Sequence, residues 1–239
     1  MIIINADDWG AEVGITDRIL SCVDCKKVNS VSAMVFMKDS ERAAKIALEK
    51  GIDTGLHLNF TLAFSSDVPR RMRHCHESVI SFLTKHKFSQ IIYNPFLKRE
   101  FAYVYQKQVD EYCRLYQKNA VRIDGHNHMH LCANIIWEHL IPQGTFVRRN
   151  YSFIENEKSF FNRKYRAIVD SMVKKRYKCT DYFFNIQQIV NTFTGNGNVD
   201  TLKTILKNSL SEILAHPGQE KDYRIINSTM FDTIFSGVC

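Results

Sequence analysis

Aspartate and histidine residues stand in four short motifs along this chain. The motifs are Asn5-Ala6-Asp7-Asp8-Trp9-Gly10, Gly55-Leu56-His57-Leu58-Asn59, Asp124-Gly125-His126-Asn127-His128-Met129-His130 and Ala215-His216-Pro217-Gly218. Carboxylates and imidazoles bind divalent cations, and a site with about three protein ligands leaves room for water and substrate. A free carboxylate beside such a site can accept a proton from the water, and another histidine can protonate a leaving group. These residue types are the parts of a metal-assisted hydrolase.

Each motif also has a simpler interpretation when it is taken alone. Asp7-Asp8 can cap a helix, His57 can be a hydrogen-bonded core histidine, and His216-Pro217-Gly218 can be a turn. What favours a shared site is position, because every motif begins where an apolar run ends. The alternation of side chains along a strand further predicts that Asp7 and Asp8 point in different directions, so that one can bind a metal while the other stays free.

Spacing does not select the ligand within the third motif. If the chain stays extended after Asp124, alternation places His126, His128 and His130 on one face. All three therefore remain candidates at this point.

Short apolar runs alternate with longer amphipathic segments. The runs predict strands at Ile2–Ala6, Ser30–Phe36, Thr54–Asn59, Ala120–Asp124, Thr145–Arg149, Asp181–Ile186 and Ser211–His216. The segments between them predict helices at Val13–Lys26, Ser40–Glu49, Ser78–Lys85, Lys98–Tyr116, Lys158–Arg176 and Val199–Leu206. This order favours an α/β fold with a mainly parallel sheet, either a closed or nearly closed barrel of about seven strands or an open doubly wound sheet. Both place a site at the carboxyl ends of the strands, where the motifs lie.

Composition and charge narrow the classes of protein. Hydrophobic residues make up 45% and charged residues 24%, which excludes a disordered chain or a coiled-coil rod. The net charge is +7, but no nucleic-acid motif accompanies the basic clusters, so we expect no nucleic-acid partner. No apolar run is long enough to span a membrane. Residues Ile2-Ile3-Ile4-Asn5-Ala6 resemble a first strand, so we expect no signal peptide. Seven scattered cysteines suit a reducing compartment, so we expect a cytoplasmic protein. A homodimer is compatible with the sequence, although no segment marks an interface.

Taken in order, the motifs resemble the successive signatures of the YdjC/ChbG-like carbohydrate deacetylases, which are related to NodB. The resemblance runs from residue 2 to about residue 218, and the opening motif together with the Asp-x-His-x-His-x-His stretch is a specific combination. It implies a single-domain distorted (β/α) barrel over residues 1–239. It also implies that the protein uses one divalent metal ion, Mg²⁺ or Zn²⁺, to remove acetyl groups from an N-acetylated sugar substrate, which is an oligosaccharide, a glycolipid or a polysaccharide precursor.

The resemblance also assigns roles to residues of this chain. The implied metal ligands are Asp8, His57 and His126, the implied general base is Asp7 and the implied general acid is His216. Four further residues are expected to contact the substrate or to support the ligands, and these are His128, His130, Asn59 and Arg148. In the implied reaction Asp7 activates water and His216 protonates the departing amine.

Three positions depart from the family pattern. Trp9 stands where phenylalanine is usual, residues 61–66 lack the glycine-containing loop, and Arg148-Arg149-Asn150 lacks an expected proline. The last two segments are expected to line the substrate pocket, so the identity of the sugar stays open. For Arg148 and Arg149, contact with an anionic substrate group and a surface role are both retained. Two alternative functions also remain: hydrolysis of another bond such as a phosphoester, and glycan binding without catalysis.

Overall fold

One sheet of parallel strands organises the computed structural model, which describes residues 1–152, 160–195 and 197–236. Its seven strands are β1 (Ile2–Trp9), β2 (Ser30–Ala33), β3 (Thr54–Leu58), β4 (Arg122–Gly125), β5 (Phe146–Val147), β6 (Tyr182–Asn185) and β7 (Ser211–Ala215), in the spatial order β5-β4-β3-β2-β1-β7-β6. Every pairing is parallel. The predicted α/β class is confirmed, and each predicted strand is present.

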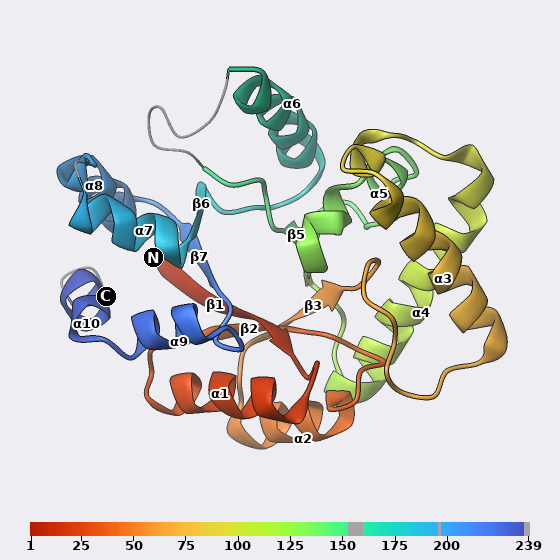
Figure 1. Ribbon diagram of the computed structural model, residues 1–239, viewed down its shortest axis with the longest axis horizontal. Helices are drawn as coiled ribbons and strands as arrows, with labels where there is room; N and C mark the ends of the chain where they lie inside the picture. Colours follow the sequence, from red (N-terminus) through yellow and green to blue (C-terminus); the bar gives the residue numbers. More distant parts are fainter. Residues whose placement is uncertain (153–159, 196, 237–239) are drawn as a thin grey trace.

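Helices surround the curved sheet on its outer side (Figure 1). They are α1 (Val13–Asp24), α2 (Ser40–Lys50), α3 (Arg70–Lys85), α4 (Lys98–Tyr116), α5 (Ala133–Trp137), α6 (Phe160–Arg176), α7 (Ile186–Thr194), α8 (Val199–Asn208), α9 (Glu220–Ile226) and α10 (Thr229–Phe235), with 3₁₀ turns η1 (Ser89–Ile91), η2 (Pro95–Leu97) and η3 (His126–Leu131). Four of them, α5, α7, α9 and α10, were not predicted. In the described part of the chain, no helix is both long and apolar enough to cross a bilayer.

The sheet nearly closes between its two edge strands. β5 has only two residues and pairs on one side with β4. On its other side Phe146 forms an isolated parallel bridge with Lys178, which precedes β6, and the Val147 amide donates to the Lys178 carbonyl at 2.7 Å. We call this contact the seam. A sheet of this kind is a distorted, incompletely closed barrel, in agreement with the expected architecture.

The end of β1 is fixed by close packing over α2. Trp9 is fully buried, and Gly10 follows it with a φ of +85°. A Cβ atom at Gly10 would lie 3.2 Å from the Ser40 Cα and 3.3 Å from the Met34 carbonyl oxygen. Only glycine combines this backbone conformation with so close an approach at little cost, so the chain can turn sharply after the two aspartates.

Helix α3 starts at Arg70, eight residues before the predicted start at Ser78. Its buried stripe consists of Met72, His76, Val79 and Leu83, at the three- and four-residue spacing of a helix. The prediction began too late because a histidine occupies one of the core positions and interrupts the apolar pattern. The His74-Cys75-His76 run therefore lies within a helix.

Candidate metal centre and active site

A bulge at the end of β1 brings two aspartates to the site. The register with β2 shifts between Ala6 and Trp9, so that Asp7 and Asp8 together stand opposite Ser32. Asp8 has a φ of +68°, a conformation that aspartate tolerates better than most side chains. Bulges re-aim side chains, and this one turns the Asp8 carboxylate toward β3 and η3.

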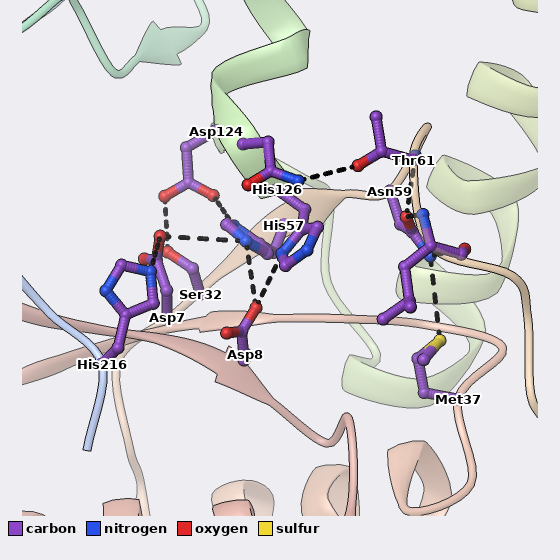
Figure 2. A network of polar contacts seen from close by, with 12 residues as sticks. Asp7, Asp8, Ser32, Met37, His57, Asn59, Thr61, Asp124, His126 and His216 are labelled. Atoms are coloured by element: carbon purple, nitrogen blue, oxygen red, sulfur yellow. Dashed lines mark hydrogen bonds and ion pairs between the residues drawn. The ribbon is translucent and has the colours of Figure 1, made fainter. Parts of the chain in front are cut away.

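Asp8, His57 and His126 converge on one point (Figure 2). The Asp8 Oδ1 atom lies 3.0 Å from the His126 Nδ1 atom and 3.5 Å from the His57 Nε2 atom. One ligand atom from each residue lies within 4.8 Å of the others. Burial alone would raise the pKa of Asp8, but the hydrogen bond with His126 and the charges of the two histidines outweigh it and lower that pKa.

The orientation of His57 suits a metal ligand. The Nδ1 atom of its buried ring is 2.6 Å from the Asp124 Oδ1 atom, whereas its Nε2 atom is buried without a hydrogen-bond partner. A carboxylate that holds one imidazole nitrogen while the other faces the ion is the usual support of a metal-binding histidine. Burial lowers the pKa of His57, but the charges of Asp7 and Asp124 and the hydrogen bond to Asp124 together raise it to about 10. Two imidazoles and one carboxylate fit a divalent cation with open positions.

A second group of potential ligands, Asp7, His57 and Asp124, is already neutralised by Arg148. The Arg148 guanidinium donates to both oxygens of Asp7 at 2.8 Å and also pairs with Asp124 at 2.8 Å and Glu212 at 2.7 Å. Burial lowers the pKa of Arg148, but these three carboxylates raise it well above the usual value. A cation at this second position would have to displace the guanidinium, so the Asp8 group is the better metal site.

The surface role retained for Arg148 is wrong, because the residue is 1% exposed. Its guanidinium lies beneath the site and pairs with the carboxylates of Asp7, Asp124 and Glu212. Arg149 is half-buried and pairs with Asp170. Both arginines therefore bind carboxylates of the protein itself, and neither guanidinium points to open solvent.

His216 approaches the site from the end of β7. Its Nε2 atom lies 3.9 Å from the Asp7 Oδ2 atom, and its Nδ1 atom lies 3.8 Å from the Asp222 Oδ2 atom. The backbone amide of His216 also donates to Asp222 at 2.8 Å, which fixes the turn into α9. Burial lowers the pKa of His216, but the hydrogen bond with Asp222 and the charges of Asp7 and Asp8 raise it above the usual value.

The chain does not stay extended through the third motif, so the expected common face of its histidines is wrong. β4 ends at Gly125, and Asn127 and His128 adopt left-handed conformations, with φ values of +53° and +59°. The turn sends His126 to Asp8 and folds His130 back over Gly125, where a Cβ atom would lie 3.1 Å from the His130 ring. Backbone conformation therefore separates three histidines that spacing leaves equivalent.

His128 and His130 occupy different surroundings. The His128 ring meets Tyr151 and Phe183 edge-on, and burial lowers its pKa well below the usual value. The His130 Nε2 atom donates to the Arg148 carbonyl at 2.9 Å, and burial lowers the pKa of this histidine to about 4. His130 thus ties η3 to the chain after β5.

Asn59 shapes the loop after β3. Its side-chain oxygen accepts hydrogen bonds from the amides of Thr61 and Leu62, and its amide group donates to the Leu62 carbonyl at 2.6 Å. The same amide group contacts the Met37 sulfur (Figure 2). Asn59 therefore supports this loop with both the oxygen and the amide group of its side chain.

A cavity of about 500 Å³ opens beside the site. From the turn that carries His126 it is lined by Asn127 and His128, and from the opposite wall by Phe88 and Ile91. Arg166 of α6 also lines it. The cavity is large enough for a sugar residue and adjoins the turn of the third motif.

Sequence reasoning missed the residues that hold this site together. Ser32 donates to Asp124 at 2.5 Å, Glu212 binds Arg148, and Asp222 binds His216. Glu212 did carry a signal, since it is a charged residue inside a predicted strand and must be paired if that strand is buried. Ser32 and Asp222 are too common in type and position to be recognised without the fold.

Comparison with known proteins identifies the family to which this chain belongs. The family model described as YdjC-like protein matches residues 1–234. A protein named carbohydrate deacetylase from Clostridium beijerinckii is 25% identical over 243 residues, which covers 96% of this chain and 86% of that protein. A crystal structure of a candidate cellobiose-phosphate cleavage protein from Enterococcus faecalis V583 superposes with a TM-score of 0.67 at 16% identity, covering 99% of this chain and 94% of the other. This last likeness shows the fold. With its family model matched over nearly its full length, the chain belongs to the YdjC-like protein family.

Proposed function

We propose that this protein is a metal-dependent N-deacetylase that hydrolyses the acetamide of an N-acetylated amino sugar to acetate and a free amine. The observation that carries the proposal is the convergence of Asp8, His57 and His126, with the buried Nε2 atom of His57 left unpartnered, directly beside the Asp7–His216 pair. The similarity to a protein named carbohydrate deacetylase supports the class of reaction and of substrate.

Asp8, His57 and His126 would hold one divalent cation, Mg²⁺ or Zn²⁺. When bound, such an ion polarises a carbonyl group and lowers the pKa of water. Asp124 keeps the His57 ring in the orientation that this role requires. Of the four residues expected to contact the substrate or support the ligands, His128 lines the cavity and is assigned to the sugar. The other three, Arg148, His130 and Asn59, are assigned to support.

Asp7 is the proposed base and His216 the proposed acid. Two hydrogen bonds from Arg148 fix the Asp7 carboxylate, so it is held in one orientation before the substrate arrives. The raised pKa of His216 increases its protonated fraction at neutral pH, which is the form that can donate to a departing amine. The two groups are 3.9 Å apart, so they face the same reacting centre.

The test combines metal content with product release. Elemental analysis of the purified protein should find about one equivalent of divalent ion per chain, lost in His57→Ala and in His126→Ala. His74→Ala, at an exposed position of α3, is the matched control and should keep the ion. A panel of N-acetylated sugars is then assayed for acetate, and phosphorylated sugars for phosphate. Absence of the ion after incubation with Mg²⁺ or Zn²⁺, or phosphate release without acetate, would contradict the proposal.

A further inference from the structure

An apolar patch lies on the surface next to the cavity. It consists of Phe88, Ile91, Ile92, Phe96 and Trp137, and we refer to these five residues as the apolar patch. Phe96 is 90% exposed, Trp137 65% and Phe88 50%. Phe88 and Phe96 belong to the connection between α3 and α4, and Trp137 stacks on Tyr93 of the same connection, so these large exposed side chains are gathered in one region. Such clusters mark interaction surfaces more often than single exposed residues do.

The patch is held in place by the structure beneath it. Asn94 and Asn134 exchange two hydrogen bonds, of 3.0 and 2.8 Å, which join the α3–α4 connection to α5. The Tyr93 ring stacks on Trp137 at 5.8 Å, and its hydroxyl donates to Glu138. Figure 1 shows α5 beside this connection. The exposed rings are therefore displayed by a braced segment.

Positive charge surrounds the patch. From residue 78 to residue 99 the chain carries Lys85, Lys87, Lys98 and Arg99 and no Asp or Glu. The acidic residue that α5 brings to this region, Glu138, is paired with Lys98 at 2.6 Å. Exposed aromatic and aliphatic side chains flanked by cations are the features with which peripheral proteins bind anionic membrane surfaces.

A second copy of this chain is the weaker candidate for the occupant. In a two-fold symmetric contact the same patch faces itself, so the segment that carries Lys85 and Lys87 would lie against an equally basic copy. The whole chain also carries a net charge of +7, which opposes self-association. An anionic lipid surface, in contrast, can bury the apolar side chains and attract the positive charge.

We propose that the apolar patch and its flanking cations dock this protein on an anionic lipid bilayer. Phe88 and Ile91 belong to the patch and also line the cavity that reaches His128, so a bound bilayer would lie at the mouth of that cavity. Delivery of membrane-held amino sugars to the site is a consequence that rests on the proposed function. Docking itself does not rest on it, because it is measured without turnover.

Vesicle flotation tests the proposal with the full chain. We expect the protein to float with vesicles of phosphatidylcholine and phosphatidylglycerol, and to stay unbound with phosphatidylcholine alone. Phe96→Ser should weaken binding about tenfold, and each of Lys85→Gln and Lys87→Gln about fivefold, with the lysine effects fading at high salt. Leu48→Ser, which removes an exposed apolar side chain from α2, is the matched control and should bind like the wild type.

Three results would overturn the proposal. The first is no flotation with anionic vesicles at low salt, and the second is equal binding by Phe96→Ser and Leu48→Ser. The third is a dimer in analytical ultracentrifugation that Phe96→Ser dissociates, because the patch would then be an interface between copies. Circular dichroism of each variant excludes misfolding as the cause, and acetate release from a water-soluble substrate reports the proposed function separately.

Discussion

Asp7 accepts two hydrogen bonds from Arg148 and one from the Asn5 side chain, all of 2.8 Å, and faces His216, so its carboxylate is held in place by protein groups. We expect Asp7→Asn to lower acetate release at least about 100-fold, because the amide that replaces the carboxylate cannot accept a proton. The variant should keep its metal ion, since Asp8 and the two histidines are unchanged. Acetate assays with elemental analysis check both expectations. Asp17→Asn, at an exposed position, is the control, and near-normal turnover by Asp7→Asn would remove Asp7 from the role of base.

Arg148 balances three buried carboxylates, and its removal leaves them facing one another. We expect Arg148→Met to lower the free energy of unfolding by about 3–5 kcal/mol, the usual cost of breaking a buried ion pair from one side. Urea denaturation of the metal-free protein measures this. Arg149→Met breaks a single, less buried pair with Asp170 and should cost about 1 kcal/mol. Equal urea midpoints for the two variants would show that the buried network adds nothing to stability.

How far sequence reasoning reached differs among the residues of the site. The four motifs were expected to meet because each lies where an apolar run ends, and parallel strands bring such ends to one edge of the sheet. Within them, Asp8, His57 and His126 were chosen on the family resemblance, since spacing left His126, His128 and His130 equivalent, and the structure brings these three together. For Arg148, contact with the substrate, support of the ligands and a surface role were all left open. Its partners Asp7, Asp124 and Glu212 come from three different strands, and only the strand order shows that they enclose one guanidinium.

At the level of elements, helix α3 carries a buried histidine where an apolar residue would be expected. The His76 ring stacks on Phe64 at 3.7 Å, and its Nε2 atom donates to the Asn59 carbonyl at 3.0 Å. It therefore fastens the helix to the loop that follows β3. Four helices were not predicted because their apolar pattern is also incomplete. Short helices such as α5 and α9 have five and seven residues, which are too few to show a helical period.

The buried His76 should make stability depend on pH. Burial lowers its pKa to about 4, whereas the unfolded chain has the ordinary value near 6.5. Between these values the unfolded state binds a proton that the folded state does not, so stability is lost as pH falls from about 6.5 to about 4. His76→Gln should reduce this slope by up to about 1.4 kcal/mol per pH unit. Urea unfolding at a series of pH values measures the slope. His74→Gln, exposed on the same helix, should keep the wild-type slope, and an unchanged slope in His76→Gln would contradict the expectation.

Over the whole molecule, the strands are unequally supported. β1 lies inside the sheet, paired with β7 from Ile2 to Ala6 and at intervals with β2, and it carries both aspartates of the site. The seam between β5 and Lys178 consists of a single bridge, at the far side of the ring. The candidate metal ligands come from β1, β3 and the turn after β4, so none of them lies on β5 or β6.

This asymmetry predicts where the molecule opens first. Amides that bond across the seam, those of Val147 and Lys178, need only a local separation of two short segments before they can exchange with solvent. β1 and β7 are interior strands with a partner on each side, so their amides should exchange only when the whole sheet unfolds. We therefore expect the seam amides to exchange at least about 100-fold faster in native-state hydrogen exchange. A destabilising variant away from the seam, such as Leu56→Ala in the buried strand β3, should speed exchange in β1 and β7 while leaving the seam nearly unchanged, because local opening does not draw on global stability. Equal protection at the seam and in β1 would instead make the ring one cooperative unit, in which the short bridge at Phe146 closes the barrel as firmly as its full strands do.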